Sequence, residues 1–136
     1  WGSEGSGDGE FRTPQDLGIG IQGNVYVSDQ GNDRIQVFDP QGRFLRKWGI
    51  RGSRDGEFIR PQGLAIDCDG NVYVSEYGND RIQVFDQQGR FLRKWKSEDN
   101  GDGEFIQPQG LAIDNDGDVY MSDQRNHRIL VFKPTI

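Results

Sequence analysis

The sequence predicts an all-β repeat protein whose unit is a group of four short strands. The first observation is a fixed period, because Trp1, Trp48 and Trp95 lie 47 residues apart. A period of this length is typical of repeat architectures. The second is that the apolar residues gather in short β-branched and aromatic runs, separated by turns rich in the 20 glycines. The third is that no segment shows the 3.6-residue period of an amphipathic helix, so we expect essentially no helix.

The second unit is complete and predicts four strands, at residues 63–67, 72–75, 81–85 and 90–95. Asp69-Gly70 is a hairpin signal between the first two strands. The first three strands carry apolar residues on both faces, which is typical of a sheet packed between two neighbouring sheets. The fourth carries Arg90, Arg93 and Lys94, and charge of this kind protects an exposed sheet edge. The segment between the fourth strand of one unit and the first strand of the next is called the linking segment here. In the second unit it contains Phe58, which we expect to anchor one sheet against the next.

The second unit closely resembles the NHL repeat. The resemblance rests on Pro-Gln-Gly-Leu-Ala-Ile-Asp at 61–67, Gly-Asn-Val-Tyr-Val-Ser at 70–75 and Asn-Asp-Arg-Ile-Gln-Val-Phe at 79–85. It covers nearly the whole chain, three times over. The resemblance implies four-stranded blades of a β-propeller, usually six around a central channel, with the first strand of each blade innermost.

The repeats divide the chain into 1–47, 48–94 and 95–136, which we interpret as one propeller segment of three blades. The third unit ends before its outer strand. Three blades are too few to close a ring, so we expect an open apolar face at each end. Such faces can close a ring if the rotation is right, and this predicts a homodimer with six blades. The alternative is a fragment of a longer propeller, natural or engineered.

Composition limits the partners. The net charge is −6 and the pI about 4.7, which argues against nonspecific nucleic-acid binding as a default. Cys68 is the only cysteine, so an internal disulfide is excluded, and a reducing compartment such as the cytoplasm is compatible with the sequence. No run of 18 apolar residues predicts a membrane span, and we expect a soluble protein that does not act at a membrane.

Each unit repeats a carboxylate at the end of its second predicted strand and an arginine at the start of its third. These residues are Asp29 and Arg34, Glu76 and Arg81, and Asp123 and Arg128. The fixed offset predicts a structural ion pair across the loop. A ring of catalytic carboxylates is the alternative, but a catalytic site rarely needs three copies of each part.

A binding site is expected where the units differ, on the loops that precede the first strand and follow the second. By resemblance, this face of a propeller often carries ligands. The residues that we assign to it are Arg51, Arg54, Arg60, Tyr77, Arg125 and His127. Arginine and tyrosine are common interface anchors, and some NHL propellers bind single-stranded RNA with such side chains. The alternative is ordinary loop variation.

The sequence gives little support for catalysis, a cofactor or a metal site. His127 is the only histidine, so the ligand set of a zinc-dependent lyase is missing. Residues 67–71 and 114–118 resemble calcium loops superficially, but Gly78 and Arg125 stand where the twelfth-position glutamate is required, and a hairpin turn accounts for them better. No Gly-x-Ser-x-Gly elbow occurs.

These observations predict a non-enzymatic scaffold that binds protein or peptide and associates with itself. The first alternative is an RNA-binding propeller. The second is a metal-dependent hydrolase or lyase, and the third is a chain without an evolved ligand. Fold does not fix function, so the choice among them rests on resemblance and composition.

Overall fold

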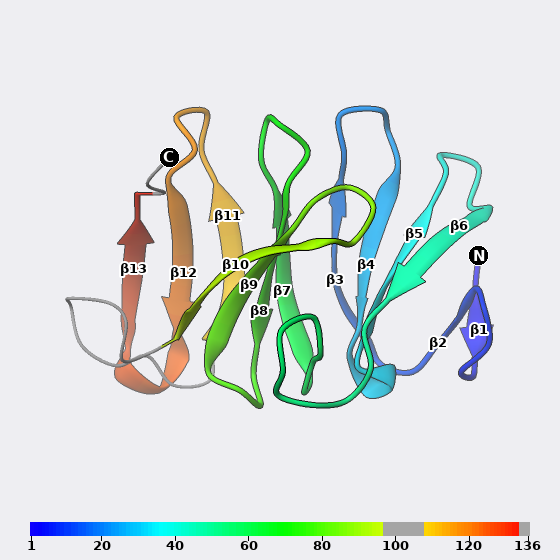
Figure 1. Cartoon of the computed structure of the whole chain (residues 1–136), viewed down its shortest axis with the longest axis horizontal. Coiled ribbons are helices and arrows are strands. Elements are labelled where there is room, and N and C mark those ends of the chain that lie inside the picture. Colours follow the sequence, from blue (N-terminus) through cyan, green and yellow to red (C-terminus); the bar gives the residue numbers. More distant parts are fainter. Residues whose placement is uncertain (97–107, 134–136) are drawn as a thin grey trace.

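The computed structural model describes residues 1–96 and 108–133, which form three antiparallel sheets standing side by side (Figure 1). We call these sheets blades 1, 2 and 3. Blades 1 and 2 have four strands, and blade 3 has three within the described residues. In each blade the strands pair in the order in which they follow along the chain. The predicted all-β propeller blades are therefore confirmed.

Blade 1 consists of β3 (Pro14–Ile19), β4 (Val25–Asp29), β5 (Arg34–Phe38) and β6 (Phe44–Trp48). Blade 2 consists of β7 (Pro61–Ile66), β8 (Val72–Glu76), β9 (Arg81–Phe85) and β10 (Phe91–Lys96). Blade 3 consists of β11 (Pro108–Ile113), β12 (Val119–Asp123) and β13 (Arg128–Phe132). Each of the four strands that the complete unit predicts is present in blade 2.

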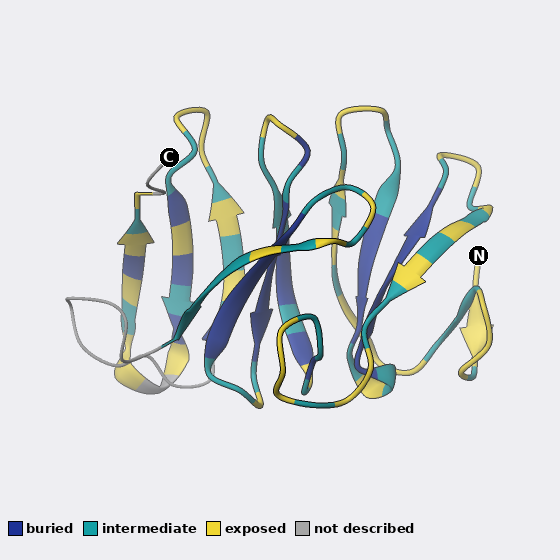
Figure 2. Ribbon diagram, in the orientation of Figure 1, coloured by how far each residue is buried: buried dark blue, intermediate teal, exposed yellow. Residues whose placement is uncertain are grey.

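The hydrophobic core lies between the blades. Tyr26, Ile35 and Val37 of blade 1 pack in one buried cluster with Phe58 and Leu64 of the second unit. A second cluster joins blades 2 and 3 through Tyr73, Ile82, Val84, Val119, Met121 and Leu130, of which the first three are equivalent to Tyr26, Ile35 and Val37. Blade 2 thus buries apolar side chains on both of its faces, which explains why its strands are apolar throughout (Figure 2).

Trp48 and Trp95 lie at these contacts between blades, and Trp1 occupies the equivalent place on blade 1. The ring of Trp48, at the end of β6, lies 6.4 Å from Tyr26 of its own blade and 5.5 Å from Phe85 of the next. Trp1 lies 4.6 Å from Phe38, which is the blade 1 equivalent of Phe85. The 47-residue period therefore marks an aromatic position that, at Trp48 and Trp95, joins neighbouring blades.

The inner strands approach closely, with β7 lying beside both β3 and β11. A Cβ atom on Gly63 would lie 2.3 Å from the carbonyl oxygen of Gln109, so this position requires glycine. Ser75 Oγ donates to the same carbonyl at 3.0 Å. Gln62 Nε2 donates to the side-chain oxygens of Gln15 at 3.2 Å and Gln109 at 2.7 Å, so a line of amides crosses the inner edge of the three blades.

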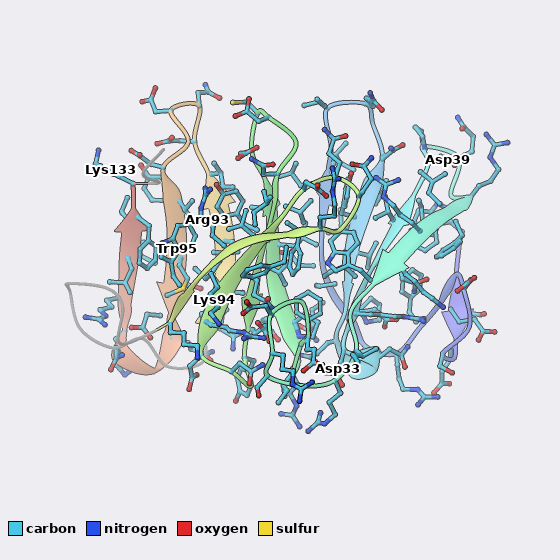
Figure 3. All side chains as sticks on the ribbon, viewed as in Figure 1. Asp33, Asp39, Arg93, Lys94, Trp95 and Lys133 are labelled. Carbon is cyan, nitrogen blue, oxygen red and sulfur yellow. The ribbon has the colours of Figure 1, made fainter. Side chains whose placement is uncertain are left out.

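Four hairpins share one turn. An aspartate accepts the backbone N–H groups two and four residues later, a local bond that favours turns. In blade 1, Asp39 Oδ1 accepts from Gln41 at 2.9 Å and from Arg43 at 2.8 Å. The other three aspartates are Asp67, Asp86 and Asp114. These turns place the hairpin tips at the end of the molecule where Figure 3 labels Asp39, opposite the end that carries Asp33.

Three local features were not predicted. The first linking segment forms a short parallel pair, β1 (Ser3–Glu4) with β2 (Glu10–Phe11). Two three-residue 3-10 helices, η1 (Gln30–Asn32) and η3 (Gln124–Asn126), follow β4 and β12.

No helix within the described residues is long and apolar enough to cross a bilayer.

The third feature concerns the loops after the second strands, which contain glycine or asparagine, residues that tolerate left-handed backbone. The residues with positive φ in these loops are Asp33, Asp80 and His127. Gly78 serves a different purpose, because a Cβ there would lie 2.2 Å from Ile59 Cγ2. Close packing against the linking segment, and not φ, requires glycine at this position.

Asp39 provides a test of the hairpin turn. The backbone N–H of Arg43, helped by its guanidinium, holds the pKa of Asp39 below its ordinary value of 3.8. A folded-state pKa below the unfolded value stabilises the turn above about pH 4, and this contribution is lost as the pH falls through the folded pKa. We expect an NMR titration of the carboxyl carbon to show this depression.

The R43A variant separates the two donors. It keeps the backbone N–H, which is the larger cause, so the pKa of Asp39 should remain below 3.8. A return of the Asp39 pKa to its ordinary value in R43A would contradict this account of the turn.

Candidate functional site

The structure brings each repeated carboxylate and arginine together. Arg34 Nε donates to Asp29 Oδ2 at 2.8 Å, Arg81 Nε to Glu76 Oε2 at 2.5 Å, and Arg128 Nε to Asp123 Oδ2 at 2.8 Å. The pair in blade 2 is almost completely removed from solvent, with side-chain exposures of 0% for Glu76 and 1% for Arg81. Charges buried to this extent require close partners.

Glu76 is fully committed to structural contacts. Besides Arg81, it accepts from Gln83 Nε2 at 2.8 Å, from Asn79 Nδ2 at 2.6 Å and from the backbone N–H of Ile59 at 3.1 Å. Asp29 accepts the same set of donors in blade 1, from Gln36, Asn32 and Arg12. A carboxylate with these donors holds a loop in place. Its oxygens are occupied by structural hydrogen bonds, so it is not placed to act as a general base.

The guanidinium of Arg81 fixes the linking segment. It donates to the carbonyl oxygens of Ser53 at 2.8 Å, Arg54 at 3.0 Å and Glu57 at 2.7 Å. Arg34 donates to the equivalent carbonyls of Ser6, Gly7 and Glu10. The pair therefore ties the loop after the second strand to the segment that enters the blade, and this places Phe58 in the core between blades 1 and 2.

Three residues of the predicted loop-face site gather around one cavity of about 280 Å³. Arg51, Arg60 and Tyr77 line it together with Ile59 and Asp80. The guanidinium carbon of Arg60 lies 5.9 Å from the centre of the Tyr77 ring, within the range of a cation–π contact. The side chain of Arg51 is 68% exposed. This arrangement offers cationic groups and one aromatic ring to a ligand from solvent.

Asp33 of blade 1 organises the cavity, and the sequence did not single it out. Its Oδ1 accepts the backbone N–H of Arg60 at 2.8 Å, and its Oδ2 lies 3.5 Å from a guanidinium nitrogen of Arg51. Arg60 has a φ of +54°, which is uncommon for a residue other than glycine. The site thus combines two units, whereas sequence reasoning considered each unit separately.

The other predicted loop-face residues lie elsewhere. Arg54 is exposed in the linking segment and does not line this cavity. His127 is exposed and follows η3 in blade 3, at the position of Asp33 and Asp80. The side chain of Arg125 lies outside the described part of the structure, as does the third copy of the linking segment.

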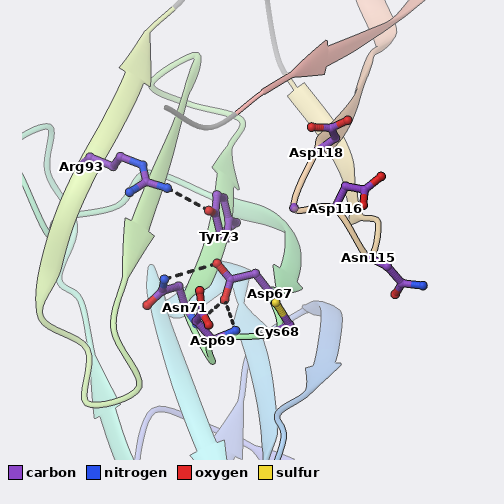
Figure 4. A pocket seen from close by; sticks show the side chains of 10 residues that line it. Asp67, Cys68, Asp69, Asn71, Tyr73, Arg93, Asn115, Asp116 and Asp118 are labelled. Carbon is purple, nitrogen blue, oxygen red and sulfur yellow. Dashed lines mark hydrogen bonds between the residues drawn. The ribbon is translucent and has the colours of Figure 1, made fainter. Parts of the chain in front are cut away.

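A second cavity, of about 390 Å³, lies between the hairpins of blades 2 and 3 (Figure 4). Asp67, Asp69, Asp116 and Asp118 contribute carboxylates to its lining, and the Tyr73 hydroxyl accepts from Arg93 Nη2 at 3.0 Å. Burial raises the pKa of the Tyr73 hydroxyl, and the charge of Arg93 opposes this. Among the described residues, no group of three or more His, Cys, Asp or Glu side chains is arranged to hold a metal ion.

Each end of the blade array exposes an apolar face. The first open face consists of Trp1, Leu17 and Ile19 on blade 1, and the second consists of Tyr120, Ile129 and Val131 on blade 3. Leu17 is 58% exposed, although its equivalent in blade 2, Leu64, is 3% exposed. Ile129 is 63% exposed and its equivalent Ile82 is 0% exposed. Faces that are core in the middle of the array are thus surface at its ends.

The comparison with known families agrees with these repeats. The NHL repeat family matches residues 58–85 and 105–132. Protein lin-41 of Caenorhabditis elegans is 45% identical over 47 residues, a stretch that covers 35% of this chain and 4% of lin-41. The chain therefore spans a small fraction of the length of that curated relative.

Solved structures share the fold. A protein of unknown function from Bacteroides thetaiotaomicron superimposes with a TM-score of 0.72 at 19% identity, over 89% of this chain and 36% of the other. Virginiamycin B lyase from Staphylococcus aureus superimposes with a TM-score of 0.66 at 15% identity, over 97% of this chain and 43% of the lyase. At such identities the likeness shows a β-propeller fold and carries no chemistry across.

The buried ion pair of blade 2 leads to a stability prediction. The E76Q variant keeps the shape of the side chain but leaves Arg81 buried without its counter-charge. Breaking a buried pair in this way costs about 3–5 kcal/mol. We expect urea unfolding, followed by circular dichroism, to show a loss of this size.

The R43A variant is the control, since it removes an ion pair whose arginine is 76% exposed. It should leave the urea midpoint nearly unchanged. If E76Q were as stable as the unaltered chain, the ion pair could not be the anchor of the loop.

Proposed function

From the premise that this chain carries NHL repeats folded as β-propeller blades, we propose that it is a non-enzymatic scaffold for protein–protein association. The observation that carries this proposal is the pair of open faces. A soluble protein rarely exposes contiguous apolar surface unless that surface binds a partner. The occupant that we propose for each face is the opposite face of a second copy.

The contacts inside the chain support this choice of occupant. Blade 2 docks on blade 1 by placing Leu64 and Ile66 against Tyr26, Ile35 and Val37. The second open face repeats the latter set as Tyr120, Ile129 and Val131, and the first open face repeats the former as Leu17 and Ile19. The two open faces thus have the residue types of two surfaces that already pack together. A heterologous contact of this kind closes a ring when the rotation per blade allows it.

Light scattering on a sizing column, over a dilution series, tests the association. The monomer mass is 15.4 kDa, and we expect a persistent mass about twice as large. The I129E variant places a charge in the proposed contact, at a residue that is exposed in the single chain. Burying an unpaired carboxylate costs several kcal/mol, so the dissociation constant should rise at least about 100-fold.

The L45E variant is the matched control, because Leu45 is an exposed apolar residue on β6 and its equivalent in the middle blade, Leu92, is 45% exposed, so neighbouring blades do not cover this position. It should leave the dimer intact. A soluble monomer at every concentration, or equal behaviour of I129E and L45E, would contradict the proposal.

The cavity at Arg51, Arg60 and Tyr77 supports a second candidate, binding of single-stranded RNA. Arginine and aromatic side chains on one exposed surface can contact phosphate and stack on a base. The net charge of −6 opposes this alternative. It therefore ranks below a protein or peptide ligand at the same face.

Fluorescence anisotropy with a labelled ten-nucleotide uridine RNA tests the second candidate. If RNA binds, affinity should fall with salt, and Y77A should weaken it by about 5-fold to 150-fold, the range for loss of one stacked base. R43A changes an exposed arginine in the hairpin turn of Asp39, at the opposite end of the molecule, and should have little effect. Absence of saturable binding at low salt would eliminate this candidate.

A further inference from the structure

The outer edge of blade 3 differs from that of the other two blades. In blade 1 the third strand, β5, is covered by β6, and in blade 2 the third strand, β9, is covered by β10. In blade 3 the third strand, β13, is the edge of its sheet within the described residues. An edge strand presents backbone N–H and C=O groups that another chain can pair with.

The two complete blades show what such a strand requires. Both β6 and β10 contain Phe-Leu-Arg-Lys-Trp. In blade 2 the register pairs Arg93 with Val84, Lys94 with Gln83 and Trp95 with Ile82. The equivalent register in blade 1 pairs Arg46 with Val37, Lys47 with Gln36 and Trp48 with Ile35. On β13 these three receiving positions are Val131, Leu130 and Ile129.

The arginine of the fourth strand has a fixed partner. Arg46 Nη2 donates to the hydroxyl of Tyr26 at 3.2 Å, and its guanidinium carbon lies 6.0 Å from the centre of that ring. Arg93 makes the same contacts with Tyr73, at 3.0 Å and 5.9 Å. The equivalent tyrosine of blade 3, Tyr120, donates its hydroxyl to Asp114 Oδ2 at 3.1 Å instead.

Charge at this end of blade 3 favours a basic partner. The hairpin next to Tyr120 carries the carboxylates of Asp114, Asp116 and Asp118, whereas the hairpin of blade 1 has Gly20, Gln22 and Asn24 at these positions. Lys133 Nζ lies 3.5 Å from Asp118 Oδ2, so one cation already contacts one of the three carboxylates. An arginine placed beside Tyr120 would therefore lie close to Asp114.

We propose that β13 accepts an extended basic segment of another polypeptide, which pairs in the register of β6 and β10 and places an arginine on Tyr120. Main-chain hydrogen bonds to the edge give affinity, and the arginine contact gives specificity. This inference deepens the proposed scaffold function by naming the chemistry of a partner. It does not depend on association between copies, because the segment pairs with the main chain at the edge of β13. Tyr120, which would receive the arginine, also belongs to the second open face.

The probe is a fluorescein-labelled peptide with the sequence of residues 87–94, Gln-Gln-Gly-Arg-Phe-Leu-Arg-Lys. It ends before Trp95, so the position that this tryptophan would take beside β13 stays open for Trp1 of a second copy. Anisotropy titration of the whole chain should show saturable binding of one peptide per chain. A scrambled peptide, and the peptide with its R93A change, should each bind at least about tenfold more weakly.

A pair of protein variants locates the contact. Y120F removes the hydroxyl that would receive the arginine, and we expect it to weaken the peptide by about threefold to tenfold. Y26F is the matched control, because the hydroxyl of Tyr26 already receives Arg46. Hydrogen exchange should show that peptide protects the amides of residues 129–132 and leaves those of β5 unchanged.

The outcomes separate this inference from the self-association. Peptide binding to a chain that remains monomeric would support the strand site and contradict the dimer. A dimer that does not bind the peptide would overturn the strand site and leave the scaffold proposal standing. Equal binding of the scrambled peptide, or protection at residues 59–60 instead of 129–132, would also overturn it.

Discussion

The buried pair of a carboxylate and an arginine determines how each blade connects to the next. In blade 2, Glu76 and Arg81 join the end of β8, the start of β9 and the linking segment through Ile59 and three carbonyl groups. Burying two charges has a large desolvation cost, which only a complete set of partners offsets. The loop geometry is therefore strongly specified, and the position of Phe58 in the core follows from it.

With the linking segment fixed, each blade presents one face to the preceding blade and another to the following blade. Stability in such an array comes mainly from contacts between nearest neighbours. The same residue types are buried at Val74 and Ile82, in the two clusters on either side of blade 2, and exposed at Ile129. The exposed ends thus arise from the repeat itself, since each unit has two apolar faces and the units at the ends of the array keep both.

The sequence predicted the strands, the hairpins and the blade fold because these depend on local signals that recur every 47 residues. The ion pair was visible as a fixed offset, for example from Glu76 to Arg81, and the structure brings these residues together. Contacts between units were harder to infer. Asp33 reaches Arg60 of the next unit over 27 residues of sequence, and no local pattern signals this. Local patterns also do not signal that Asp80 has left-handed backbone, or that Gly78 is required for packing and not for its φ.

The candidate surfaces also differ in how far the sequence predicted them. Repetition identified the open faces, because Tyr120 and Ile129 can be compared directly with buried Tyr73 and Ile82. Variation between units identified Arg60 and Tyr77, but it also selected Arg54, which the structure places outside the cavity. Differences between repeats thus locate a region of the surface, whereas the residues that act together are decided by packing across the blades.

The central claim is that the two open faces complete each other across two copies. Cys68 is exposed, is the only cysteine and lies in blade 2, the middle blade, so it can carry a spin label without a new mutation. In a closed ring of two copies the two middle blades lie opposite each other. Electron double resonance should then give one narrow distance distribution between the labels of two chains. Absence of any intermolecular distance, or the several distances expected of an open filament, would contradict the account.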